Sequence, residues 1–393
     1  MTNKIRTVYQ KLCAVSVFIG VNRLPLVQAF FHYCKQSEQA DKLCAYAAFV
    51  AETYQGGGDL TALLQKQIFE DENVYVCAVA QGKQVPKLIQ QSVIRELDAF
   101  ALFGALAPVD FAEDLDLPVQ EIPAYICREY DFNGAYQDRL FNLNRYGYGI
   151  FSSQAMFRLS DEKKIEPIVS ADTISLDAFI GYDNERAQVV ENTRAFLSGR
   201  PAANALLCGD AGTGKSSTVK AVANAFFDQG LRLIELRKDQ LSLLPYVMAK
   251  ISGNPLKFII FIDDLSFRKS DDDFSMLKAA LEGSASAKAD NAVIYATSNR
   301  RHIIKESFGD REGDDVHRND TLQETLSLSE RFGLVVLFSK PNKPLYLEIV
   351  KRLAQKSGIR MDETQLFVQA EAFALRKGNR SARCAEQFIN SLL

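Results

Sequence analysis

Residues 209–216 read GDAGTGKS, which matches the pattern G-x-x-x-x-G-K-[ST] of a phosphate-binding loop. The apolar run Asn204–Cys208 precedes the motif and suits a buried parallel strand. Apolar residues after the motif recur at the spacing of one helix face: Val219, Val222, Ala223, Phe226 and Phe227. A strand before the loop and a helix after it are the context that this motif requires, and a chance glycine-rich turn would not explain both. The sequence therefore predicts a phosphate site here.

The residue types in the loop suit the phosphates of a nucleotide. Gly212 and Gly214 allow a tight turn whose backbone N–H groups point at phosphate oxygens, and the next helix adds the positive end of its dipole. Lys215 supplies a charge for the β- and γ-phosphates, and Ser216 supplies a hydroxyl to Mg²⁺. The predicted contact residues are Gly209, Asp210, Ala211, Gly212, Thr213, Gly214, Lys215, Ser216 and Ser217.

Two carboxylates follow a second apolar run. Phe258–Ile262 lacks polar alternation, which predicts a strand buried on both faces, and Asp263 and Asp264 come directly after it. Ligands bind at the carboxyl ends of strands in open α/β sheets. We expect Asp263 to belong to the Mg²⁺ site and Asp264 to polarise an attacking water. The alternative, in which the pair caps the next helix, is disfavoured by the presence of the loop.

A third apolar run, Ala292–Ala296, ends in Thr297, Ser298 and Asn299. An amide at the tip of a central strand is well placed to orient a water, so Asn299 is a candidate site residue. The alternative is that Ser298 or Asn299 is the N-cap of a helix. The basic stretch 300–302 is expected to be surface rather than a phosphate or partner contact.

The end of the chain predicts a small helical bundle. A last strand is expected at Leu334–Phe338, followed by Pro341 and Pro344. Two apolar helix faces come after it: Tyr346, Ile349, Val350 and Leu353 form the first, and Ala385, Phe388, Ile389 and Leu392 form the second.

The N-terminal half predicts a mostly helical unit, and no set of residues in it has the spacing of a catalytic or metal site. The apolar stretch Leu12–Val21 resembles the core of a signal peptide but lacks a small-x-small cleavage site, so we expect a buried helix or strand. The predicted organisation is an N-terminal helical domain over 1–145, a connector over 146–175 with a strand near 150–159, a nucleotide-binding α/β domain over 176–340 and a helical lid over 341–393.

Composition excludes several classes of protein. The 393 residues are 47% apolar and 24% charged, which is typical of a globular protein rather than a disordered or fibrous one. The net charge of −3 disfavours a dedicated nucleic-acid-binding domain. Seven scattered cysteines and three histidines have no zinc spacing. No apolar stretch reaches the ~18 residues of a membrane span, so we expect a cytoplasmic protein with buried reduced thiols and no membrane partner.

Taken in order, these blocks resemble the AAA+ ATPases over about residues 172–393. The chain looks closest to an uncharacterised bacterial family of stand-alone AAA+ ATP-binding proteins with a variable N-terminal half. The blocks that carry this resemblance are GYDNERAQ (181–188), GDAGTGKSS (209–217), FIDDLSF (261–267), ATSNRRH (296–302) and SLSERFGL (327–334). The resemblance implies an α/β P-loop NTPase fold with a C-terminal helical lid, ATP and Mg²⁺ as cofactors, and self-association into a ring, expected to be a hexamer.

The resemblance also implies roles for single residues. Gly181 and Tyr182 resemble the segment that lines the adenine pocket. Arg331 resembles the arginine finger that reaches the nucleotide of a neighbouring subunit, although a structural salt bridge is the alternative. Arg383 resembles the second sensor on the lid, with Arg380 as the other candidate. Asn299, discussed above, resembles the first sensor.

One departure from the family pattern bears on activity. AAA+ proteins mostly carry Asp-Glu after the buried strand, whereas this chain carries Asp263 and Asp264. The shorter carboxylate reaches about 1.3 Å less far, which predicts slow hydrolysis or a loop that moves closer on assembly.

Two function classes stay open. In the first, which Asp264, Asn299 and Arg331 favour, ATP hydrolysis at a subunit interface drives remodelling of a protein client bound by residues 1–170. In the second, the protein is a nucleotide-dependent switch or loader with little hydrolysis on a DNA-associated complex.

Overall fold

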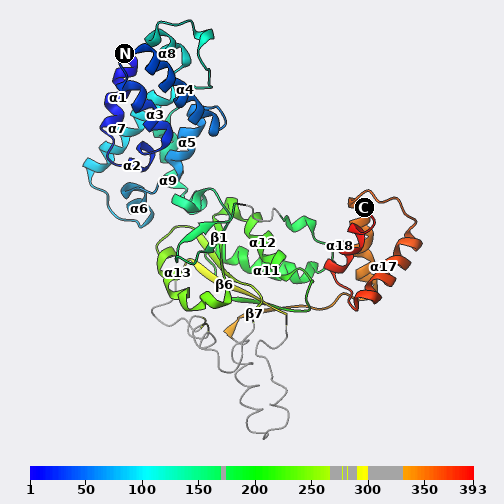
Figure 1. The fold of residues 1–393 in the computed structure, drawn as a ribbon. Coiled ribbons are helices and arrows are strands. Elements are labelled where there is room, and N and C mark those ends of the chain that lie inside the picture. Colours follow the sequence, from blue (N-terminus) through cyan, green and yellow to red (C-terminus); the bar gives the residue numbers. More distant parts are fainter. Residues whose placement is uncertain (170–173, 266–276, 278–280, 282–289, 300–330) are drawn as a thin grey trace. The chain divides into compact units, whose positions relative to one another are not determined.

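The computed structural model describes residues 1–169, 174–265, 277, 281, 290–299 and 331–393. The chain divides into two compact units, Met1–Ser153 and Gln154–Leu393, which are described separately (Figure 1). The predicted fold class is confirmed, because a mostly helical N-terminal region precedes a sheet with parallel strands and C-terminal helices.

The N-terminal unit is a bundle of helices around an aromatic core. Phe30 packs against Phe103 with ring centroids 4.8 Å apart, and Phe49 stacks on Phe111 at 5.6 Å. Rings in such pairs stabilise a core beyond the area they bury. The α-helices are α1 (Asn3–Cys13), α2 (Ile19–Asn22), α3 (Pro25–Lys35), α4 (Gln39–Gln55), α5 (Leu60–Glu70), α6 (Val74–Ala80), α7 (Lys87–Gly104), α8 (Pro108–Leu115), α9 (Phe132–Phe141) and α10 (Leu143–Tyr146); the 3-10 helices are η1 (Val119–Glu121) and η2 (Gly149–Ser152).

The apolar stretch 12–21 forms the end of α1, a loop and most of α2, rather than one continuous element. Its loop is organised by a buried carboxylate. Glu96 of α7 is 1% exposed and accepts hydrogen bonds from the backbone N–H groups of Ser16 (2.8 Å), Val17 (2.9 Å) and Phe18 (3.0 Å), and from the Ser16 hydroxyl (2.7 Å). These bonds satisfy the N–H groups of Val17 and Phe18, which the loop buries away from water.

The second unit is built on a seven-stranded sheet in the order β2-β1-β4-β5-β6-β3-β7. Strand β2 is antiparallel to β1, and the other neighbouring pairs are parallel. The strands are β1 (Met156–Leu159), β2 (Ile165–Pro167), β3 (Ala205–Gly209), β4 (Leu231–Leu236), β5 (Lys257–Ile262), β6 (Ala292–Ser298) and β7 (Leu334–Phe338). Residues 146–175, expected to be a connector, thus contribute the two short strands at one edge of the sheet.

Strand order decides where the site lies. The strand before the phosphate-binding loop, β3, lies between β6 and β7, and β6 lies between β3 and β5. Parallel neighbours end at the same edge, which brings the residues after β3, β5 and β6 together. As predicted, β5 is buried on both faces: Ile259 and Phe261 join one core cluster, and Ile260 between them is also fully buried.

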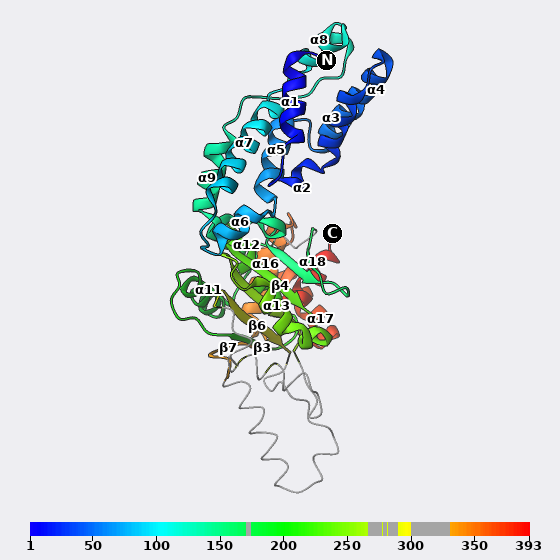
Figure 2. The same cartoon turned by 90° about the vertical axis from the view of Figure 1, so that its left-hand side faces the viewer.

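Helices α11 (Asp183–Leu197) and α12 (Lys215–Ala225) pack with one face of the sheet (Figures 1 and 2). Val219, Val222, Ala223 and Phe226 are buried there, as their spacing predicts. Phe227 does not continue this face: α12 ends at Ala225, and Phe227 begins the 3-10 helix η4 (Phe227–Gln229). Its ring instead lies 4.0 Å from the guanidinium of Arg232. The unit also contains η3 (Leu176–Ala178), η5 (Lys238–Leu243) and α13 (Leu244–Ile251).

Three helices after β7 have a core of their own: α16 (Lys343–Lys356), α17 (Glu363–Lys377) and α18 (Ala382–Asn390). The two predicted apolar faces meet in this core, where Tyr346, Ile349 and Val350 pack with Ala385, Phe388 and Ile389. Ile180, from the segment before α11, packs against the same core. The three C-terminal helices therefore contact the segment that precedes α11.

The cysteines only partly follow the sequence expectation. Cys208 and Cys384 are buried, but Cys13 and Cys44 are exposed, so the expectation of buried thiols is wrong for these two. Amphipathic helices place a small residue on a solvent face as readily as on a core face.

In the part of the chain that the structure describes, none of the helices combines the length and the apolar character that crossing a bilayer demands.

Candidate functional site

The loop between β3 and α12 has the backbone shape that its glycines allow. Gly209 has φ +134°, and a Cβ there would lie 2.1 Å from the carbonyl oxygen of Phe338 on β7, so only glycine fits. Gly214 has φ +90° and leads directly into α12 at Lys215. Asp210 does not point its carboxylate into the loop: Oδ2 accepts a hydrogen bond from Lys340 N–H at 2.9 Å, which ties the loop to the end of β7.

Lys215 lies beneath this loop and is 5% exposed. Its ammonium group donates to the carbonyl oxygens of Gly209 (3.1 Å) and Asp210 (2.7 Å) and to Oδ1 of Asn299 (3.0 Å). Burial lowers the pKa of Lys215, while the carboxylates of Asp210, Asp263 and Asp264 oppose this shift. The cation is therefore held among acceptors directly beneath the loop.

Three oxygen-bearing side chains meet beside the lysine. Oδ1 of Asp263 accepts hydrogen bonds from the hydroxyls of Ser216 (2.6 Å) and Thr297 (2.5 Å). Carboxylate and hydroxyl oxygens are hard ligands of the kind that Mg²⁺ prefers, so the residues present fit that ion. The sequence predicted Ser216 and Asp263 for this place but assigned no role to Thr297.

Asp264 and Asn299 are in direct contact. Nδ2 of Asn299 donates to Oδ1 of Asp264 at 2.7 Å, while Oδ1 of the same amide accepts from Lys215. Asp264 has φ +50°, a region that non-glycine residues rarely adopt. Its N–H donates to Oδ1 of Asp263 (3.1 Å) and to the Thr297 hydroxyl (3.0 Å). The geometry thus brings together Lys215, Asn299 and Asp264, which come from three separate segments of the chain.

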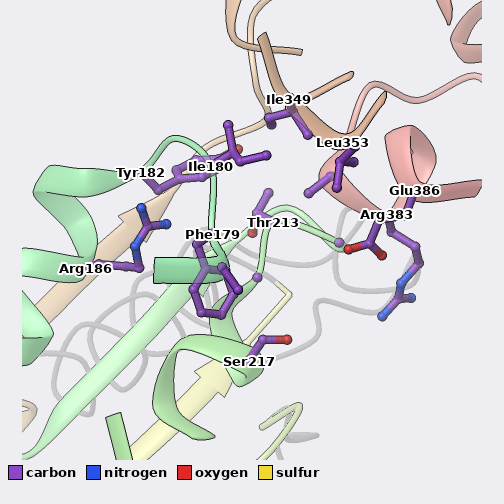
Figure 3. Close-up of a pocket in the computed structure, with 14 residues that line it drawn as sticks. Phe179, Ile180, Tyr182, Arg186, Thr213, Ser217, Ile349, Leu353, Arg383 and Glu386 are labelled. Carbon is purple, nitrogen blue, oxygen red and sulfur yellow. The ribbon is translucent and has the colours of Figure 1, made fainter. Parts of the chain in front are cut away.

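A pocket of about 200 Å³ adjoins the loop (Figure 3). A single water needs about 10–15 Å³ of such space, so the pocket can admit a group larger than water. Its lining joins the segment before α11, the phosphate-binding loop and the C-terminal helices: Ala178, Phe179, Ile180, Tyr182, Arg186, Gly212, Thr213, Gly214, Ser217, Ile349, Leu353, Ala382, Arg383 and Glu386.

The predicted segment at Gly181 and Tyr182 borders this pocket. Gly181 has φ +75°, and a Cβ there would lie 2.5 Å from Cδ1 of Leu345, so glycine lets the segment approach α16. Tyr182 lines the pocket, and its hydroxyl donates to the carbonyl oxygen of Ser339 at 2.7 Å. Burial raises the pKa of Tyr182 to about 12, so its hydroxyl stays protonated near neutral pH.

The two lid arginines have different surroundings. Arg383 lines the pocket, and its N–H donates to the carbonyl oxygen of Gly212 at 3.5 Å. Ser381, the N-cap of α18, places Arg383 in the first turn. Arg380 instead forms a two-pronged contact with Glu371, with N–O distances of 2.9 and 2.8 Å. The structure thus brings Arg383, and not Arg380, to the phosphate-binding loop.

Arg331 lies apart from the other predicted residues. It precedes β7, and Leu334, the first residue of that strand, pairs with Ala205 at the start of β3. The phosphate-binding loop begins at the opposite ends of both strands, about 13 Å away along the strand direction. Arg331 is therefore not part of the site within its own subunit. The predicted blocks at 266–267, 300–302 and 327–330 lie outside the described residues.

Comparison with protein families identifies the family of this chain. Residues 152–393 match the family described as "Protein of unknown function (DUF815)", which spans well over half of the chain. The chain belongs to this family. All of the candidate site residues fall within the matched range, whereas most of the N-terminal helical unit lies outside the DUF815 match.

Comparison with solved structures finds a distant similarity. The Holliday junction branch migration motor RuvB of Thermotoga maritima matches with a TM-score of 0.34 and 14% sequence identity, over 56% of this chain and 72% of that chain. A mutant form of the same motor matches with a TM-score of 0.35 and 15% identity over the same shares. A search among curated proteins finds no significant match.

Several residues of the site in this DUF815 chain escaped sequence reasoning. Phe179 and Arg186 form one wall, with the guanidinium 5.2 Å from the ring centroid and 2.6 Å from Oδ1 of Asp183. Ile349 and Leu353 form part of another wall. The helical spacing of Ile349 and Leu353 predicted a core face, and no local signal distinguishes a core face from a pocket wall.

Proposed function

We propose that this protein binds ATP with Mg²⁺ at the loop 209–217 and hydrolyses it at an interface between subunits, and that hydrolysis drives remodelling of a protein client. The contact chain from Lys215 through Asn299 to Asp264, beside Asp263 and Ser216, carries the proposal. A site that bound phosphate without hydrolysing it would need only the lysine and the loop. The carboxylate and amide at the ends of β5 and β6 add groups suited to a water that attacks a phosphate.

Each residue would have a separate task. Lys215 and the backbone N–H groups of the loop would bind the phosphates, and Ser216 and Asp263 would hold Mg²⁺. When bound, that ion would neutralise charge on the phosphate oxygens. Asp264 would accept a proton from the attacking water, and Asn299 would orient that water. Arg383 would bind a phosphate from the lid side, since its backbone lies against Gly212.

The pocket beside the loop supports a nucleotide over a simple phosphate. Ile180, Ile349 and Leu353 give it apolar walls, which suit the faces of a purine base. The loop and this pocket share Gly212, Thr213 and Gly214, so one ligand can reach both. We therefore assign adenine to the pocket and the phosphates to the loop.

Arg331 carries the interface part of the proposal. Its place at the start of β7, away from its own loop, favours a role in the site of a neighbouring subunit, in a ring expected to be hexameric. Residues 1–170 would bind the client, because nothing in the described part of the N-terminal unit resembles a second catalytic centre. We propose a cytoplasmic location, and nucleic acid is not the favoured partner.

One observation favours a second candidate, a nucleotide-dependent switch with little hydrolysis on a DNA-associated complex. Asp264 is shorter than glutamate, and its Oδ1 accepts a hydrogen bond from Asn299. A carboxylate so engaged is a poorer acceptor for a proton of water.

The steady-state ATPase rate per chain, measured with Mg²⁺ over a wide range of protein concentration, separates these candidates. We expect the rate per chain to rise with concentration, because the site is completed only when Arg331 of a second subunit reaches it. A constant, non-zero rate would assign hydrolysis to the lone subunit and remove Arg331 from the mechanism. ATP binding without turnover would favour the switch.

A charge placed in the proposed adenine pocket should weaken nucleotide binding. We expect Leu353→Glu to raise the Kd for ATP about 10- to 100-fold, because a carboxylate buried against the base costs about 1–3 kcal/mol. The measurement is titration with a fluorescent ATP analogue. Leu375→Glu is the matched control, since Leu375 is 72% exposed on α17 and does not line this pocket. An unchanged Kd for Leu353→Glu would place the base elsewhere.

A further inference from the structure

One buried hydroxyl connects the end of β6 to the carboxylate of Asp263 and to the backbone N–H of Asp264, the two residues that follow β5. We propose that Thr297 is a positioning residue that orients the Asp263 carboxylate toward the magnesium ion of a bound nucleotide. The inference rests on the proposed function, because it concerns the same ion. Thr297 lies two residues before Asn299, and its task differs from that of the amide.

The geometry around Asp263 is the first line of evidence. Three donors converge on its Oδ1: the hydroxyls of Ser216 and Thr297 at 2.6 and 2.5 Å, and the N–H of Asp264 at 3.1 Å. Among the described residues, none donates a hydrogen bond to Oδ2. A carboxylate fixed by three bonds to one oxygen presents its other oxygen in a defined direction, which is what an ion with strict octahedral geometry requires.

The hydroxyl of Thr297 is itself fixed, which is the second line of evidence. The residue is 2% exposed, and its Oγ1 accepts the N–H of Asp264 at 3.0 Å. A hydroxyl has one proton, and that proton goes to Asp263. The Thr297 carbonyl oxygen also accepts the N–H of Leu265 at 2.7 Å. Thr297 thus contacts three consecutive residues after β5.

These contacts act where the backbone turns sharply. Asp264 has φ +50°, a conformation that is unfavourable for an L-residue unless its surroundings stabilise it. The two hydrogen bonds from its N–H, to Asp263 and to Thr297, provide that stabilisation. Loss of the Thr297 hydroxyl would leave Asp263 with two donors and Asp264 with one acceptor. We therefore expect the direction of the Asp263 carboxylate to depend on this hydroxyl.

The test compares Thr297→Val with Thr297→Ser in the full chain. Valine keeps the volume and branching of threonine, whereas serine keeps the hydroxyl. The Kd of a non-hydrolysable ATP analogue is measured by calorimetry with MgCl₂ and again with EDTA. The gain from Mg²⁺ is the ratio of the Kd in EDTA to the Kd in MgCl₂. We expect this gain to be about tenfold or more smaller in Thr297→Val than in wild type, as for other residues that orient a metal ligand. The Kd in EDTA should not change, and Thr297→Ser should restore most of the gain.

Thr193→Val is the matched control, because Thr193 is also fully buried and its hydroxyl bonds to Val189 O and to the Tyr295 hydroxyl in α11 and β6. It should leave the gain from Mg²⁺ unchanged. The inference would be overturned if wild type and Thr297→Val gained the same affinity from Mg²⁺, or if Thr297→Val lost as much affinity in EDTA as in MgCl₂. Either result would leave the proposed function in place. A wild-type protein that binds the analogue with no gain from Mg²⁺, or not at all, would overturn both.

Discussion

Substitution of Arg331 by alanine is expected to lower the ATPase rate per chain by about 10³-fold or more, with little change in the Kd for ATP. An arginine supplied to a transferring phosphoryl group contributes about 10³–10⁵ in rate, because it stabilises charge that develops only in the transition state. Arg331 lies at the opposite end of β7 from its own phosphate-binding loop, so in the proposed mechanism the group that it serves belongs to another subunit. Steady-state kinetics at saturating ATP measures the effect.

A mixing experiment tests the arrangement between subunits directly. Arg331→Ala keeps an intact loop, and Lys215→Ala keeps an intact arginine, so each variant alone is expected to be inactive. In a mixed assembly, the intact loop of one chain can face the intact arginine of the other. We therefore expect activity to return when the two variants are combined in equal amounts. If the mixture stays inactive, or if Arg331→Ala alone has wild-type activity, the result would favour the alternative in which Arg331 forms a structural salt bridge.

Loss of the Glu96 carboxylate is expected to destabilise the N-terminal unit by about 4 kcal/mol. Glu96 accepts hydrogen bonds from three consecutive backbone N–H groups, at Ser16, Val17 and Phe18. In Glu96→Ala these donors would lose their acceptor, at a cost of about 1–3 kcal/mol for each of the two buried groups, the N–H groups of Val17 and Phe18. Chemical denaturation followed by circular dichroism would show the shift in midpoint.

Two further variants make this result specific. Glu96→Gln keeps one oxygen acceptor, so we expect roughly half of the loss. Arg95→Ala removes the exposed neighbour on α7 and should change the free energy of unfolding by less than about 0.5 kcal/mol. If Glu96→Ala unfolds at the midpoint of Arg95→Ala, water replaces the carboxylate and the loop is not organised by it.

The contiguous parts of the fold followed from the sequence. Three elements lie where their patterns predicted: the loop 209–216, the strand that precedes Asp263 and Asp264, and the last strand, Leu334–Phe338. Each depends on a few neighbouring residues of fixed type and spacing, and local backbone preferences act over the same range. Strand β1 forms only the end of the strand predicted near 150–159, and β2 was not predicted. Both are short: β1 is stabilised by pairing with β4, far along the chain, and β2 by pairing with β1.

The sequence by itself determined which chemical groups the candidate site contains: the loop with its lysine, two carboxylates and an amide at the ends of apolar strands. Only the tertiary structure decided which groups touch. In the folded chain the hydroxyl of Thr297 bonds to Asp263, and Arg383 rather than Arg380 lines the pocket. Leu353 lines the same pocket and also packs against the core of the C-terminal helices. The physical reason is that strand order and helix packing bring together side chains separated by tens to hundreds of residues, and no local pattern records such distances.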